Sequence, residues 1–145
     1  MKILVAVDGS QASLGAVRHV MQLAREGLQA DIVLASVQEP TYVYELVLPP
    51  SADVLERLSG AVGERALAGA EALLTEAGVA YTREIGSGEA APALVEIARR
   101  HGCAKIVMGA RGLGAVRGAL LGSVSQGVLQ KAEVPVTIVK EGAAS

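Results

Sequence analysis

Apolar stretches of strand length alternate with amphipathic stretches of helix length along this chain. Continuous runs of Val, Ile, Leu and Ala are typical of parallel strands that are buried on both faces. Apolar residues that recur every three or four positions indicate helices with one buried face. The pattern predicts strands over 3–7, 31–37, 79–85, 105–108 and 134–139, and helices over 10–28, 51–77, 89–100 and 122–131.

Cap and turn residues mark several boundaries of these elements. Asp8-Gly9-Ser10 follows the first strand as a turn, and Ser10 is a candidate N-cap of the first helix. Ser51 or Asp53 is the candidate cap of the second helix. Residues 38–50 include three prolines and are predicted to form a long surface loop that covers a ligand.

The order of these elements predicts the architecture. Strand and helix alternate from the first strand to the fifth, and right-handed crossovers then place helices on both faces of one parallel sheet. Alternating apolar and polar residues over 79–85 predict an edge strand. We therefore expect one three-layer α/β domain over 1–140, followed by a loose tail over 141–145.

Composition excludes several other classes of protein. The 145 residues suit a single domain, and no apolar run approaches the roughly 18 residues that span a membrane. The apolar start over 3–7 runs into Asp8, so we expect a buried strand there and no signal peptide. Cys103 is the only cysteine, which agrees with a reducing compartment and predicts a cytoplasmic protein.

Charge and aromatic content argue against two kinds of partner. The net charge is −2, with no basic cluster to attract a nucleic acid or an anionic membrane. Aromatic residues make up 2% of the chain and all are tyrosine, so stacking platforms for single strands are scarce. We expect neither nucleic acid nor a membrane as a partner.

The segment from Met108 to Val124 carries the clearest candidate chemistry. A predicted strand ends near Gly109, Gly112 follows, and Gly122-Ser123 opens a helix. Backbone N–H groups of a turning glycine loop form an anion-binding concavity, and a helix N-terminus adds partial positive charge. Ser123 is expected to cap the helix or to donate its hydroxyl to a phosphate. Alternatively, these glycines only turn the chain, in a protein that has 17 of them.

Other nucleotide motifs are missing from the sequence. There is no Gly-x-x-x-x-Gly-Lys-Ser/Thr loop, and the first turn is not Gly-x-Gly-x-x-Gly. Asp8, at the end of the first strand, is either an ordinary turn residue or a ligand-binding residue. Arg111 and Arg117 either screen phosphate charge or are solvated surface residues. His19 and His101 lack metal-ligand spacing and are expected to be structural.

Three features occur in a fixed order along the chain. They are the opening KILVAVDGS over 2–10, the spacing Gly-x2-Gly-x9-Gly-Ser over 109–123, and the closing VPVTIVK over 134–140. Together they resemble the universal stress protein family, in its ATP-binding branch, over the whole chain. One departure is Ser36, where relatives often carry histidine.

The resemblance implies a fold and a place for a ligand. The fold is adenine nucleotide alpha hydrolase-like, with the strand order 3-2-1-4-5. The chain then reverses direction between strands 1 and 4, and such switch points bind ligands in open α/β sheets. Asp8 and Gly109 end these two strands, so both are expected to lie at one crevice.

The resemblance also implies roles for individual residues. The ligand would be ATP, or ADP or AMP, with Mg²⁺ possible through the phosphates. Asp8 would accept from the ribose hydroxyls or contact the cation, and Val37 would meet the adenine through its backbone. The other implied site residues are Ala6 and Val7 beside the adenine, Met108, and the phosphate cradle of Gly109, Gly112, Gly122, Ser123 and Val124.

The expected function is that of a regulatory ATP-binding protein whose nucleotide biases the state of a homodimer. We expect no enzymatic activity beyond slow ATP hydrolysis, because phosphoryl transfer normally needs a positioned base and strong cationic stabilisation. A slow Mg²⁺-dependent ATPase, a nucleotidyl-transfer enzyme and a nucleotide-free scaffold dimer are the alternatives. The dimer is expected to form through Val134, Val136 and Ile138 of the fifth strand, an apolar sheet edge without protective charges.

Overall fold

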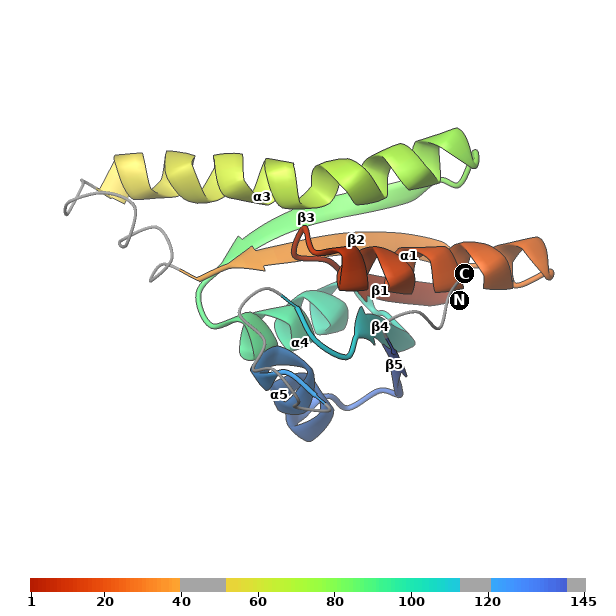
Figure 1. Cartoon of the computed structure of the whole chain (residues 1–145). Helices are drawn as coiled ribbons and strands as arrows, with labels where there is room; N and C mark the ends of the chain where they lie inside the picture. The colour runs from red at the N-terminus through yellow and green to blue at the C-terminus, as the bar shows by residue number, and fades with distance from the viewer. Residues whose placement is uncertain (40–51, 113–120, 141–145) are drawn as a thin grey trace.

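The computed structural model describes the backbone of residues 1–39, 52–112 and 121–140, and their side chains except those of 52–59. Strands and helices alternate along it (Figure 1). The strands are β1 (Lys2–Ala6), β2 (Asp31–Gln38), β3 (Tyr81–Ser87), β4 (Lys105–Gly109) and β5 (Val136–Val139). The helices are α1 (Gln11–Arg25), α3 (Ala52–Glu76), α4 (Ala90–His101) and α5 (Ser123–Lys131).

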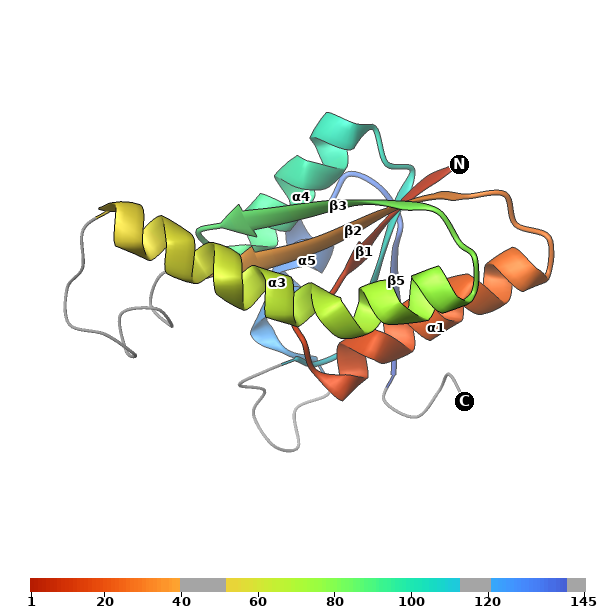
Figure 2. The same ribbon diagram turned by 90° about the horizontal axis from the view of Figure 1, so that it is seen from above.

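The strands form one parallel sheet in the order β3-β2-β1-β4-β5. Helices α1 and α3 cover one face, and α4 and α5 cover the other (Figures 1 and 2). This arrangement confirms the predicted α/β fold and its strand order. Strand β3 lies at an edge, as its alternating sequence predicts, and β5 lies at the opposite edge.

The central strand shows why the sequence reads as an uninterrupted apolar run. Ile3 and Val5 point into the core under α1 and α3, whereas Leu4 and Ala6 point into the core under α4 and α5. All four are buried. Because successive side chains of a strand alternate between faces, a strand covered on both faces has no position left for a polar residue.

Small residues let the helices approach their neighbours closely. A Cβ added at Gly63 of α3 would overlap the side chain of Ile85 on β3. A Cβ added at Gly127 of α5 would be 2.6 Å from the Cβ of Ala91 on α4. Both glycines therefore set the packing distance between elements, and the second fixes α5 against α4.

The helix boundaries confirm one predicted cap and correct two others. The hydroxyl of Ser10 accepts a hydrogen bond from the backbone N–H of Ser13 at 3.1 Å, so Ser10 caps α1 as predicted. Gly122 is the N-cap of α5, so Ser123 is the first helical residue and does not cap the helix. Asp53 already lies inside α3 and is not its cap.

Other element ends differ from the prediction by a few residues. Helix α1 ends at Arg25, three residues before the predicted end, because Gly27 adopts a left-handed backbone with φ of 108°. Strand β5 begins at Val136, after Pro135, which has no N–H to donate to a ladder.

Some predictions fall outside the described residues. These are the predicted loop beyond residue 39, Ser51, most of the segment between Gly112 and Leu121 including Arg117, and the tail over 141–145. Within the described part of the chain, none of the helices combines the length and apolar character needed to cross a bilayer.

Candidate functional site

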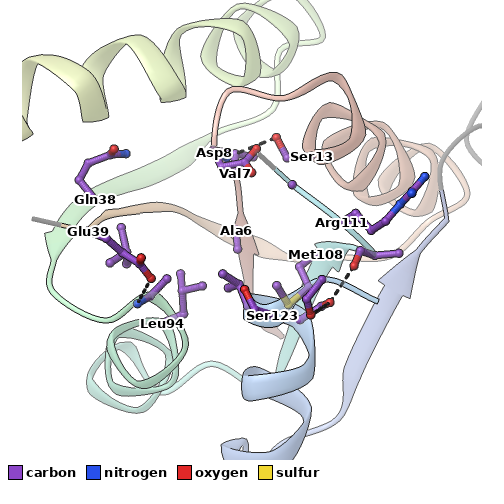
Figure 3. A pocket seen from close by; sticks show the side chains of 18 residues that line it. Ala6, Val7, Asp8, Ser13, Gln38, Glu39, Leu94, Met108, Arg111 and Ser123 are labelled. Carbon is purple, nitrogen blue, oxygen red and sulfur yellow. Dashed lines mark hydrogen bonds between the residues drawn. The ribbon is translucent and has the colours of Figure 1, made fainter. Parts of the chain in front are cut away.

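A cavity of about 200 Å³ opens at the carboxyl ends of β1, β2 and β4 (Figure 3). This is the switch point of the sheet, since the chain leaves β1 toward one side and β4 toward the other. The structure brings all ten sequence-predicted site residues to its wall. They are Ala6, Val7, Asp8, Val37, Met108, Gly109, Gly112, Gly122, Ser123 and Val124. Their role in holding a ligand stays a prediction.

One end of the cavity is apolar. Ala6 and Met108 are buried side chains of the core under α4 and α5, and Leu94 of α4 packs in the same core. Val37 is half-buried against this cluster. The cavity wall therefore continues the hydrophobic core, which gives this end a surface suited to a flat apolar ring.

Asp8 is held by the turn between β1 and α1. Its Oδ1 accepts a hydrogen bond from the backbone N–H of Ser10 at 2.9 Å, and its own N–H donates to the Ser13 hydroxyl at 3.3 Å. The Ser13 hydroxyl in turn donates to the Ser10 carbonyl at 2.9 Å. Asp8 is thus a turn residue and a cavity residue at once, so the two interpretations of the sequence are not exclusive.

Gly112 and Gly109 are each required for a different structural reason. A Cβ at Gly112 would overlap Oδ2 of Asp8, so this glycine lets the loop meet the first turn. A Cβ at Gly109 would lie 3.1 Å from the carbonyl oxygen of Ala12, so this glycine lets β4 pack against the start of α1. The requirement for glycine at 109 is therefore explained by packing, a reason that spacing along the sequence does not reveal.

The N-terminus of α5 forms the other end of the cavity. The backbone N–H of Gly122 donates to the carbonyl of Ala110 at 2.8 Å, and the buried hydroxyl of Ser125 donates to the same carbonyl at 2.7 Å. These bonds fix the helix start against the end of β4. The first N–H groups of a helix have no partner within it, so they suit an anion at this end.

Three charged side chains line the cavity among the described residues: Asp8, Glu39 and Arg111. Arg111 lies next to the start of α5, because its Cα is 3.5 Å from the position of a Cβ on Gly122. Whether Arg111 screens phosphate charge stays a prediction. Glu39 follows β2, and its Oε1 accepts from the backbone N–H of Ala90 at 3.3 Å.

Sequence reasoning did not name several lining residues as site residues. They are Ser13, Gln38, Glu39, Ala90, Leu94, Ala110 and Ser125. Two of them, Gln38 and Glu39, begin the segment that it predicted to cover a ligand, although Gln38 belongs to β2 rather than to a loop. Gln38 and Glu39 could have been predicted from the sequence, because they follow directly on Val37 at the carboxyl end of a parallel strand, where open sheets bind ligands. Ala90 and Leu94 carried none, because only the tertiary packing of α4 places them here.

The described residues also limit how a cation could be held. Across 1–39, 60–112 and 121–140, no three His, Cys, Asp or Glu side chains gather into a metal-binding group. Asp8 is the acidic side chain next to the glycine loop. A Mg²⁺ shared between Asp8 and the phosphates of a ligand stays a prediction.

Comparison with known proteins gives one consistent family. The universal stress protein family matches residues 1–140. Universal stress protein MJ0531 of Methanocaldococcus jannaschii is 31% identical over 140 residues, which cover 97% of this chain and 82% of that protein. The structure of hypothetical protein MJ0577 aligns with a TM-score of 0.78 at 27% identity, covering 97% of this chain and 95% of that one. A universal stress protein in complex with cAMP aligns with a TM-score of 0.65 at 28% identity, covering 96% and 95%.

Proposed function

This chain belongs to the universal stress protein family, and on that premise we propose that it binds an adenine nucleotide, with ATP as the main ligand, in the cavity between β1 and β4. One observation carries the proposal. The described loop glycines with the N-terminus of α5, and Asp8 of the first turn, converge on a single cavity from two separate parts of the chain. The structural neighbour in complex with cAMP supports an adenine nucleotide as the ligand class.

The shape of the cavity suggests how the nucleotide lies. The adenine ring occupies the apolar end beside Ala6 and Leu94, with the backbone of Val37 at its edge. The phosphates occupy the opposite end, beside Arg111, where the first N–H groups of α5 favour negative charge. The ribose then lies between them, within reach of Asp8. The same carboxylate would be the protein group that holds a phosphate-bound Mg²⁺.

We further propose that the protein works by binding rather than by turnover. Within the described cavity wall, Arg111 is the single cationic side chain, and neither lysine nor histidine occurs there. Phosphoryl transfer normally requires a positioned base and strong cationic stabilisation. Hydrolysis is therefore expected far below the roughly 1–10³ s⁻¹ typical of enzymes. Multiple-turnover phosphate release above about one per second, lost in Asp8→Ala, would overturn this part.

We propose that nucleotide binding changes the conformational state of a cytoplasmic homodimer. Strand β5 lies at the sheet edge, and its sequence carries no charge before Lys140. An exposed strand edge is satisfied by pairing with a second copy about a twofold axis. A nucleotide that fits one state of the dimer better than another shifts the balance between these states. The free thiol of Cys103 agrees with a reducing compartment.

Two measurements test the central proposal. Mass spectrometry of the purified, denatured protein should release an adenine nucleotide, and calorimetry on protein stripped of it should show ATP binding with Mg²⁺ present. Titrations with ADP and AMP rank the working ligand. A folded, stripped protein that gives no heat of binding with any of the three at millimolar concentration contradicts the proposal.

A further inference from the structure

Glu39 places a carboxylate at the apolar end of the cavity. Its Oε1 accepts from the N–H of Ala90, the first residue of α4, at 3.3 Å. The N-cap residue of this helix, Glu89, makes no side-chain cap bond, so Glu39 takes the place of the cap. The partial positive charge of a helix N-terminus stabilises a carboxylate there. The side chain of Glu39 is thereby fixed at the cavity wall.

Glu39 and Arg111 lie at opposite ends of the cavity (Figure 3). Glu39 follows β2 and Arg111 follows β4, and β1 lies between these two strands. Two strand spacings, about 10 Å, therefore separate the two chain segments. The end with Arg111 and the start of α5 suits phosphate oxygens. The end with Glu39 suits hydrogen-bond donors, because a carboxylate only accepts.

Purine bases differ in what they present at position 6. Adenine carries an amino group with two N–H donors, whereas guanine and hypoxanthine carry a carbonyl oxygen. An amino group facing the carboxylate of Glu39 forms a charge-assisted hydrogen bond. A carbonyl oxygen there faces the carboxylate as a second acceptor with no donor between the two, which costs binding free energy.

We propose that Glu39 selects 6-amino purine nucleotides over 6-oxo purine nucleotides in this cavity. The inference rests on the proposed nucleotide binding and adds the residue that distinguishes among nucleotides. Among the described lining residues, Glu39 is the charged side chain at the end opposite Arg111. The neighbouring Gln38 has its amide nitrogen engaged with the Ser36 hydroxyl at 3.0 Å.

The experiment compares ATP with inosine triphosphate, which has the same ribose and triphosphate but carries a 6-oxo group and an N1–H in place of the 6-amino group and the unprotonated N1. Calorimetry on the full chain with Mg²⁺ should give at least about tenfold tighter binding of ATP, the difference expected from one charge-assisted hydrogen bond. In Glu39→Gln the amide presents either a donor or an acceptor. The ratio should then fall to within about threefold, and inosine triphosphate should bind more tightly than it does to wild type. Structural damage would not produce that gain.

Glu89→Gln is the matched control. It removes the same charge at the same helix end, from an exposed residue that is not part of the cavity wall. Its nucleotide ratio should equal that of wild type.

The outcomes separate this inference from the proposed function. A wild-type protein that binds no ATP overturns the proposed function. Binding of ATP without discrimination, a Glu39→Gln protein that keeps the ratio, or a Glu89→Gln protein that loses it overturns the role of Glu39 alone. A folded Glu39→Gln protein that binds neither nucleotide also overturns that role, because loss of a specificity residue should relax selection and not abolish binding.

Discussion

The carboxylate of Asp8 lies directly against the backbone of Gly112, so closely that a Cβ on Gly112 would overlap its Oδ2. The two residues are more than a hundred positions apart in the chain and lie in the segments that follow β1 and β4. Their contact joins the first turn and the glycine loop into one rim of the cavity. The position of each therefore depends on the other.

Gly112→Ala should weaken ATP binding by displacing Asp8. The added Cβ forces the carboxylate or the loop to move, and a displacement of about 1 Å at a binding site is costly. We expect at least a tenfold loss of affinity by calorimetry. Gly60→Ala on α3 is the control, because its Cβ would meet nothing within 4 Å. Equal affinity in both variants would contradict the importance of the contact.

Asp8→Asn separates the turn role of Asp8 from its ligand role. The amide oxygen still accepts from the N–H of Ser10, so the free energy of unfolding should stay within about 0.5 kcal/mol of wild type. Loss of the negative charge should weaken Mg²⁺-dependent ATP binding by about tenfold or more. Urea titration and calorimetry measure the two effects. Asp8→Ala should lose both stability and ATP affinity. Normal ATP binding in Asp8→Asn would show that Asp8 is a turn residue only.

The crevice could be predicted because the family resemblance implies the strand order and the position of the crevice then follows from topology. Once strands 1 and 4 are adjacent and parallel, the residues at their carboxyl ends, Asp8 and Gly109, must lie near each other. The burial of Ile3 and Leu4 on opposite faces likewise follows from an uninterrupted apolar run. Such features depend on the order of elements and not on the distances between them.

Features that depend on packing distance were not predictable in the same way. Glu39 bonds to Ala90, 51 positions later, and only the docking of α4 on the sheet brings them together. Gly127 has no special backbone angle, and its role is visible only from the closeness of Ala91. Glycine spacing alone also suggested that each glycine makes room for phosphate, whereas Gly109 makes room for α1.

Acid should weaken the fold through Glu84 on β3. His101 Nε2 lies 2.7 Å from Oε1 of Glu84, and Arg100 pairs with the other oxygen. Partial burial acts to raise the pKa of Glu84, but the hydrogen bonds from His101 and Arg100 outweigh it and hold this pKa below the ordinary 4.5. A lowered folded-state pKa contributes stability above pH 4.5, and this contribution is lost as the pH falls below that value.

Urea titrations between pH 7 and pH 3 measure this effect. Glu84→Gln should be less stable than wild type at pH 7, and the difference should shrink as the pH falls below 4.5. Glu76→Gln is the control, because it removes an exposed carboxylate at the end of α3, away from Arg100 and His101. A difference between wild type and Glu84→Gln that is independent of pH would contradict the assignment.

The last prediction is that the protein forms a dimer through β5. The carbonyls of Pro135 and Val139 accept from the N–H groups of Ile106 on β4 and of Ala110, the residue after β4, at 3.0 Å each. Since backbone groups of a strand alternate in direction, those of Val136 and Ile138 point away from β4 toward the edge. We therefore expect the same strand of a second copy to pair there about a twofold axis.

Sedimentation equilibrium at tens of micromolar should show a wild-type dimer and an Ile138→Lys monomer. Ile138 is partly buried against the core under α4 and α5, so circular dichroism must first show that the variant is folded. Val62→Lys is the control, because it places the same charge on an apolar residue of α3 that is 38% exposed and belongs to the layer on the other face. This variant should remain a dimer. A monomeric wild type would contradict the dimer, and a folded Ile138→Lys protein that is still dimeric would place the interface elsewhere than at Ile138.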